Sequence, residues 1–239
     1  MHTALKKQLI DLSTAPYRKT GRFNYQWARG KLRYDPIFSA LIEQSVLPDG
    51  ARILDLGCGR GLLAAWLLAA EHMAENGNWS DTVQPPRGLQ FRGIELMERE
   101  ANCGNQALQP FYGKRVQLYG GDMRNADMSN ADVIAILDVL HYIPIDEQER
   151  MLDQIRATLK PGGIFVTRVG NAGNSLCFRI SQLTDRCISF VQGHRLPGMW
   201  CRPADEWIRA LENRGFSVQA TPKSEGTPFA NVMLVARVA

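Results

Sequence analysis

The feature that most constrains this chain is a short apolar run followed at once by a turn containing Gly57, Gly59 and Gly61. Residues 52–56 are expected to form a buried strand, and a Leu- and Ala-rich helix is expected over 62–70. Glycines at such a junction let the chain turn sharply and let a ligand touch the backbone, beside a helix N-terminus that favours negative charge. The turn therefore indicates a nucleotide-like ligand, although alone it is also compatible with a purely structural role.

The glycine spacing argues against two common nucleotide-binding loops. A dinucleotide fingerprint is G-x-G-x-x-G/A, and Leu62 occupies its last position here. A phosphate-binding loop would contain G-K-[ST], and no such run is present. The pattern that holds is G-x-G-x-G, with Asp55 two residues before the first glycine.

Strands and helices alternate after the turn, which implies right-handed βαβ units on a parallel sheet. Residues 71–90 are expected to be an exposed loop. We expect further strands at 89–95, 115–119, 131–137 and 164–169, helices at 98–108, 145–159 and 203–214, and closing strands at 216–220 and 232–238. The closing strands leave no room for a helix between them and are expected to be antiparallel. The sequence thus predicts an α/β, Rossmann-like, doubly wound fold with a seven-stranded, mostly parallel sheet and an antiparallel C-terminal strand.

Acidic residues lie at the ends of three successive predicted strands. Glu95 ends the second strand, Asp122 follows the third and Asp138 follows the fourth. Each alone is compatible with a solvated carboxylate or a helix cap. Ligands of open α/β sheets bind at the carboxyl ends of the strands, where an acid can accept both ribose hydroxyls. The three acids together therefore favour a nucleoside site beside the glycine turn.

The run Ile53-Leu54-Asp55-Leu56-Gly57-Cys58-Gly59-Arg60-Gly61 resembles motif I of class I S-adenosylmethionine (SAM)-dependent methyltransferases. Four later runs resemble the later motifs of that family in the same order, namely residues 93–95, 121–123, 137–143 and 159–163. The Leu-His-Tyr-Ile run at 140–143 is similar to small-molecule methyltransferases of the quinone-biosynthesis type. Shorter runs at 21–23, 28–32, 193–197 and 226–231 resemble a bacterial subgroup associated with aryl polyene pigment clusters, which suggests secondary metabolism.

The resemblance implies a cofactor, SAM, whose product is S-adenosyl-L-homocysteine (SAH), and a set of residues that bind it. The glycines would pack under the methionine moiety, Glu95 would bind the ribose, Asp122 and the Met123 backbone would bind adenine, and Asp138 would lie near the methionine amino group. The expected cofactor-binding residues are Asp55, Gly57, Cys58, Gly59, Gly61, Glu95, Leu96, Asp122, Met123, Asp138 and Arg29.

The N-terminal segment is basic and aromatic. Residues 1–36 hold eight Lys and Arg against two Asp, so they carry +6 while the remainder of the chain carries −2. This arm can attract nucleic acid or anionic lipid, or it can be a solvated leader. A third interpretation, which we prefer, is a lid in which Arg29 or Lys31 pairs with a carboxylate of cofactor or substrate. We therefore expect a lid at 1–36 and a methyltransferase domain at 37–239, with a substrate-covering insert at about 170–202.

His141 is the candidate catalytic base, because a neutral imidazole can take a phenol proton near pH 7. The alternative is that His141 only packs against the cofactor or caps the next helix. The expected substrate contacts are Tyr25, Tyr142, His194, Arg195 and Trp200, with Arg202 a further candidate. Tyr142 is equally compatible with a core position, and His194 with a solvated loop.

Composition limits the classes of protein and the cellular compartment that the sequence allows. Five widely spaced cysteines without a C-x-x-C pair indicate neither a disulfide framework nor a zinc site, and point to a reducing cytoplasm. No run is long and apolar enough to span a membrane, and no signal peptide is evident. No metal is expected. We predict a cytoplasmic SAM-dependent methyltransferase that O- or C-methylates a small aromatic or acidic metabolite. An RNA methyltransferase or a non-catalytic SAM-binding protein remains the alternative, and the oligomeric state stays open.

Overall fold

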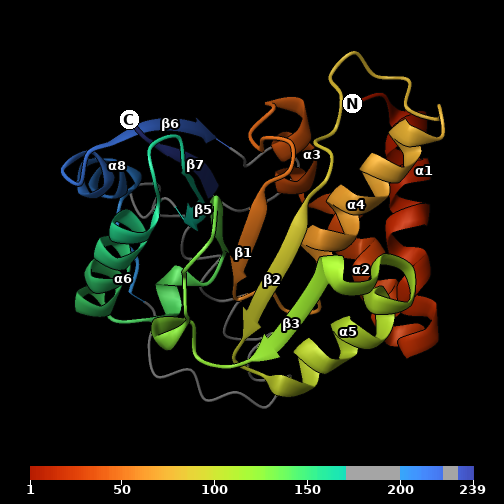
Figure 1. Cartoon of the computed structure of the whole chain (residues 1–239), viewed down its shortest axis with the longest axis horizontal. Coiled ribbons are helices and arrows are strands. Elements are labelled where there is room, and N and C mark those ends of the chain that lie inside the picture. Colours follow the sequence, from red (N-terminus) through yellow and green to blue (C-terminus); the bar gives the residue numbers. More distant parts are fainter. Residues whose placement is uncertain (171–199, 223–230) are drawn as a thin grey trace. The chain divides into compact units, whose positions relative to one another are not determined.

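The computed structural model describes residues 1–170, 200–222 and 231–239 (Figure 1). Seven strands form one sheet in the order β3-β2-β1-β4-β5-β7-β6. They are β1 (Arg52–Leu56), β2 (Gln90–Glu95), β3 (Val116–Gly120), β4 (Val133–Leu137), β5 (Ile164–Gly170), β6 (Phe216–Pro222) and β7 (Asn231–Val238). The pairs β1·β2 and β2·β3 are parallel, whereas β7 is antiparallel to both β5 and β6. The predicted Rossmann-like sheet with an antiparallel C-terminal strand is therefore confirmed.

The described helices and turns alternate with these strands. They are α1 (Thr3–Thr14), η1 (Ala15–Thr20), α2 (Arg22–Tyr34), α3 (Pro36–Glu43), α4 (Leu62–Glu75), α5 (Glu98–Tyr112), η2 (Gly113–Arg115), η3 (Met123–Asn125), η4 (Leu140–Tyr142), α6 (Ile145–Thr158) and α8 (Ala204–Glu212). The chain divides into two compact units, Met1–Val133 and Ile134–Ala239.

The first unit is built around β1, β2, β3 and the helices that pack on them. Figure 1 shows these three strands side by side, and α1 packs along α4 while η1 packs on α5. Helix α4 is Leu- and Ala-rich, and Trp66 at its centre is fully buried and donates its indole N–H to the Phe38 carbonyl at 2.9 Å. The N-terminal arm is thus an ordered helical layer whose apolar positions, such as Leu9 and Leu32, lie in the core.

Helix α4 runs to Glu75, so the predicted exposed loop over 71–90 begins too early. Two buried side chains explain the difference. Met73 extends the apolar face of the helix, and Glu71, which is 3% exposed, accepts the Gly88 amide at 2.7 Å and pairs with Arg115. A buried carboxylate is stable only when such partners satisfy it. Glu71 therefore ties the end of α4 to the returning chain.

The second unit contains the apolar strands β5 and β7 and the helices α6 and α8. Strand β5 is buried from Ile164 to Val169, as expected for a strand covered on both faces. Trp207 of α8 is 2% exposed, and the buried Thr167 hydroxyl donates to the Ile136 carbonyl at 2.8 Å. Helix α6 begins directly after Pro144 and carries Asp146 in its first turn, as the sequence predicts.

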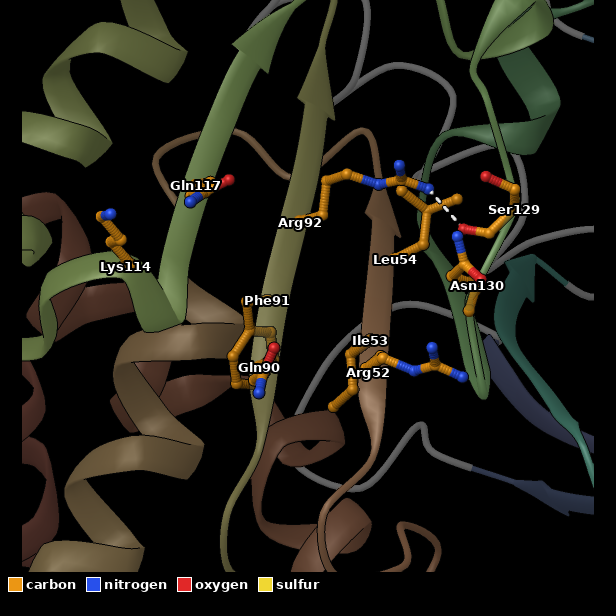
Figure 2. Close-up of a pocket in the computed structure, with 11 residues that line it drawn as sticks. Arg52, Ile53, Leu54, Gln90, Phe91, Arg92, Lys114, Gln117, Ser129 and Asn130 are labelled. Carbon is orange, nitrogen blue, oxygen red and sulfur yellow. Dashed lines mark hydrogen bonds between the residues drawn. The ribbon is translucent and has the colours of Figure 1, made fainter.

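The link between β3 and β4 is held by arginines instead of by a helix. In the described chain it contains η3 and no longer helix. The Arg92 guanidinium on β2 donates to the Asp127 carbonyl at 2.6 Å and to the Ser129 carbonyl at 3.0 Å. At the other end Arg52 forms a two-pronged ion pair with Asp132. Figure 2 shows Arg92 reaching toward Ser129 beside a hollow of about 200 Å³, which is lined by strands β1 to β3 and this link.

We predict that Arg92→Met lowers the free energy of unfolding by about 1 to 2 kcal/mol, because two carbonyls lose a charged donor. Lys114→Met is the matched control, since Lys114 lines the same hollow and makes none of these bonds to the link. Urea denaturation of the two variants measures the difference. Equal stability of both variants would mean that Arg92 does not hold the link.

Candidate functional site

The glycine turn of the first unit has the backbone that only glycine adopts readily. Gly57, Gly59 and Gly61 have φ angles of +78°, +54° and +74°. The amides of Gly57 and Cys58 donate to the Ile94 carbonyl at 2.8 and 3.2 Å, so the turn is fastened to the end of β2. A Cβ atom added at Gly59 would meet no atom within 4 Å. The turn therefore leaves open space beside its backbone, as a ligand cradle requires.

The Glu95 carboxylate is oriented by the same turn. One oxygen accepts the Gly59 amide at 2.9 Å, and the other accepts the Met97 amide at 3.0 Å. Each carboxylate oxygen keeps a further lone pair for a hydroxyl donor. Next to it Leu96 is 74% exposed, which is unusual for a large apolar side chain. A nucleoside with its ribose on Glu95 and an apolar contact at Leu96 fits this arrangement.

Asp55 lies near the end of β1, two residues before Gly57, and is only 6% exposed. Its burial, together with the nearby Glu95 carboxylate, raises the pKa of Asp55 to about 7. Burial also raises the pKa of the Cys58 thiol well above its usual range. The first unit thus places two carboxylates and an uncharged thiol together, and a positively charged ligand group would relieve the repulsion between the carboxylates.

Asp122 lies at the end of β3, close to the end of β2. The Gly121 amide donates to the Glu95 carbonyl at 2.9 Å, which joins the two strand ends. The Asp122 carboxylate caps η3 by accepting the Arg124 amide at 2.9 Å, and the Arg124 guanidinium pairs with it. The hydrogen bonds from the Arg124 side chain, and to a lesser extent that from its amide, lower the pKa of Asp122. Met123 begins η3, so both residues expected at the adenine lie on one short turn.

The N-terminal arm is packed directly on the glycine turn through Arg60, which the sequence analysis did not single out. The buried Tyr17 hydroxyl donates to the Arg60 carbonyl at 2.9 Å. The Arg60 guanidinium lies over the rings of Phe23 and Trp27, at 5.8 and 5.0 Å from their centroids, and pairs with Glu100. Cation–π contacts of this kind depend on spatial neighbours far apart in the chain, so the motif alone gave no signal for them.

Arg29 and Tyr25, the two predicted site residues of the arm, contact each other. The Arg29 guanidinium pairs with Asp11 and donates to the Tyr25 hydroxyl at 3.2 Å. The Arg18 guanidinium donates to the same hydroxyl, also at 3.2 Å. The hydrogen bond to Asp11 raises the pKa of Arg29. Two cations therefore converge on Tyr25, and a ligand carboxylate would have to compete with Asp11 for Arg29.

In the second unit Asp138 follows β4 in a left-handed conformation, with φ +64°. This backbone is uncommon for a residue other than glycine and is often found at functional sites. Its carboxylate pairs with Arg168 of β5, whose side chain is 4% exposed. An arginine inside an apolar strand was the available sequence signal for this partner, because a buried guanidinium requires a counter-charge.

His141 lies on η4, three residues after Asp138, and its ring lies 4.1 Å from that of Tyr142. Burial lowers the pKa of the His141 imidazole, and the Asp138 carboxylate opposes that shift. The Trp200 amide donates to the His141 carbonyl at 2.8 Å. The second unit therefore brings together three predicted residues, His141, Tyr142 and Trp200, and keeps the imidazole neutral near pH 7.

Of the other predicted substrate residues, the structure describes only Arg202. His194 and Arg195, and with them most of the predicted insert, lie outside the described residues. Arg202 is 5% exposed, pairs with Glu149 and lies over the Trp207 ring. These contacts give Arg202 a structural role. Among the described residues no cluster of three or more His, Cys, Asp or Glu side chains is placed to hold a metal ion.

The described helices also include none that is long and apolar enough to cross a membrane. Residues 24–221 match the family described as "Methyltransferase domain". The chain belongs to this family, which confirms the prediction made from its motifs. SAM is the cofactor that the family supports.

Relatives of known name agree with this assignment. The chain is 26% identical to the carboxy-S-adenosyl-L-methionine synthase of Actinobacillus succinogenes, over 64% of each chain. It is 27% identical to the ubiquinone biosynthesis O-methyltransferase of Coxiella burnetii, over 54% of this chain and 47% of the relative. The chain thus matches about half to two thirds of the length of these curated relatives.

Two solved structures resemble the fold. Magnesium protoporphyrin IX methyltransferase from Synechocystis, with bound SAH, superposes with a TM-score of 0.59 at 17% identity, over 91% of this chain and 88% of that one. Mitomycin 7-O-methyltransferase superposes with a TM-score of 0.60 at 21% identity, over 96% of this chain and 60% of that one. At these identities the likeness concerns the fold.

We predict that Asp55→Asn stabilises the ligand-free protein in a pH-dependent way. A carboxyl whose pKa is raised on folding to about 7 makes the folded state progressively less stable as pH rises from about 4 to about 7. The free energy of unfolding of Asp55→Asn minus that of the unmodified protein should therefore grow over this window, by on the order of 3 kcal/mol, and be constant above it.

Denaturation with urea at pH 5, 6, 7 and 8 measures this difference. Glu95→Gln removes the second cause of the shift, so Asp55→Asn made in that background should give a smaller pH-dependent gain. A difference that does not vary between pH 5 and 7 would contradict a buried, readily protonated Asp55.

Proposed function

We propose that this protein transfers the methyl group of SAM to a small aromatic or acidic metabolite, on oxygen or carbon. The observation that carries the proposal is the glycine turn, whose Gly59 amide fixes Glu95 while open space remains beside the backbone. Membership of the methyltransferase domain family supports the same activity. The named relatives and structural neighbours that act on small molecules favour that substrate class.

In this proposal the cofactor lies along the carboxyl ends of β1, β2 and β3. The glycines and Cys58 support its methionine moiety, and Glu95 accepts its ribose hydroxyls. Leu96, Asp122 and Met123 surround the adenine. Because its pKa is raised to about 7, the Asp55 carboxyl is largely protonated below pH 7 in the ligand-free protein. The cationic part of the cofactor favours its ionised form, so cofactor binding below pH 7 is expected to release the proton of Asp55. The family motif implies that Asp138, which is held by Arg168 within the second unit, is the partner of the methionine ammonium.

The chemistry that SAM supplies is a methyl group on a sulfonium, which becomes the neutral thioether of SAH when the methyl bond to sulfur breaks. The chain must orient the acceptor in line with that bond and exclude water. For a phenol acceptor, SAM would supply the methyl group to the phenol oxygen, and an imidazole nitrogen of His141 would take the phenol proton. The buried His141 is neutral near pH 7 and can accept that proton.

We further propose that the N-terminal helices act as a lid over the acceptor. The Arg29 guanidinium donates a hydrogen bond to the Tyr25 hydroxyl, and the arm contacts the glycine turn where Arg60 lies over the Trp27 ring. An acidic acceptor would displace Asp11 from Arg29. The arm's lysines and arginines are partly neutralised within the chain, as in the Lys31–Asp35 pair, which favours a small anionic molecule over RNA.

Calorimetry tests cofactor binding. Gly59→Arg should weaken SAH binding at least 100-fold, because the new side chain fills the cradle. Gly77→Arg is the matched control: Gly77 also has a positive φ and open space around it, but lies in the loop after α4. Its SAH affinity should be unchanged. Failure of the unmodified protein to bind SAH, or intact binding by Gly59→Arg, would refute the proposal.

A second experiment tests His141. In a panel of phenols and hydroxylated aromatic acids, mass spectrometry should detect a methylated product for at least one acceptor. His141→Ala should then reduce turnover on a phenol about 100-fold, in the usual range for general bases, with SAH affinity unchanged. His72→Ala, which removes an exposed imidazole from α4, is the control and should leave turnover unchanged. Equal turnover of His141→Ala and the unmodified protein would dismiss the base.

A further inference from the structure

Gln148, in the first turns of α6, is fully buried and directs its side chain into the turn that carries His141. Its amide nitrogen donates to the carbonyls of Leu140 and Ile143, each at 3.0 Å. These two carbonyls belong to the start of η4 and to the residue that follows it. The side chain therefore spans the turn from one end to the other.

The same amide nitrogen also donates to the Trp200 carbonyl at 2.9 Å. Trp200 returns a hydrogen bond to the turn, because its own amide donates to the His141 carbonyl. One carboxamide thus joins two segments that are far apart in the chain, the turn after β4 and residue 200. Arg202 fastens the next residues of that segment to α6 by donating to the Ile145 carbonyl at 3.1 Å.

These contacts differ from ordinary helix capping. Pro144 precedes α6 and makes no side-chain cap, and the Gln148 side-chain oxygen accepts from none of the free amides at the start of the helix. Its side-chain oxygen is buried and has no hydrogen-bond partner among the described residues. A buried amide oxygen without a partner is costly, so the donor side of the carboxamide must compensate. The two N–H groups of the carboxamide face three carbonyls, two in the turn and one at Trp200, so one hydrogen is shared between two of them.

We propose that Gln148 is a positioning residue, which holds the His141 turn and the Trp200 segment in fixed register so that base and acceptor meet. The assignment rests on the proposed function for the roles of His141 and Trp200. Gln148 itself touches no reacting atom. Its contribution is to restrict the turn to one backbone geometry and to couple that geometry to the segment at residue 200.

The test replaces the donor and follows the turn without needing an acceptor. In Gln148→Met, the Trp200 amide should exchange with solvent at least 10-fold faster by NMR, because the two segments separate. The His141 ring-proton resonances should shift and titrate at higher pH as water reaches the imidazole. Gln148→Glu keeps the shape but replaces donors by acceptors, and should give the same changes. SAH affinity should stay within twofold.

Ile155→Ala is the control, since Ile155 is buried on α6 and makes none of these hydrogen bonds. It should lower the melting temperature without altering Trp200 exchange or the His141 titration. Unchanged exchange and titration in both Gln148 variants, or equal changes in Ile155→Ala, would overturn the inference. Absence of SAH binding to the unmodified protein would refute the proposed function instead, and would leave these two readouts interpretable.

Discussion

The hydrogen bond between the Gly59 amide and the Glu95 carboxylate is the interaction on which the first unit's candidate site depends. It requires a left-handed backbone at Gly59, and it fixes the carboxylate at the end of the neighbouring strand. The adjacent amides of Gly57 and Cys58 bind the same strand end. Turn and strand end are thereby joined, and Asp55 acquires its raised pKa first from its burial and second from the nearby Glu95 carboxylate.

The second unit follows a related principle with different chemistry. There the left-handed residue is Asp138, and the group that holds it is a buried arginine, Arg168. Gln148 then holds the turn that follows. In both units a left-handed backbone after a strand is held by one polar side chain from a neighbouring element, and only at Asp138, which is not a glycine, does that backbone carry strain.

The sequence predicted the strands and the acids at their ends because those features are local. Apolar runs such as Ile164–Val169, and the glycine spacing after Asp55, need no knowledge of distant residues. It could not predict that Arg60 lies over the rings of Phe23 and Trp27, or that Gln148 reaches Trp200, since these contacts join remote segments. It also placed the start of the loop at residue 71, because the contacts that bury Glu71 come from Gly88 and Arg115, which are distant in the chain.

The most direct test of the central claim is a crystal structure of the protein with SAH. We expect the ribose hydroxyls of SAH within hydrogen-bond distance of both Glu95 oxygens and its methionine moiety over Gly57 to Gly61. Leu96 should lie against the adenine. Electron density for SAH away from this turn, for example in the hollow beside Arg52 and Arg92, would contradict the account (Figure 2).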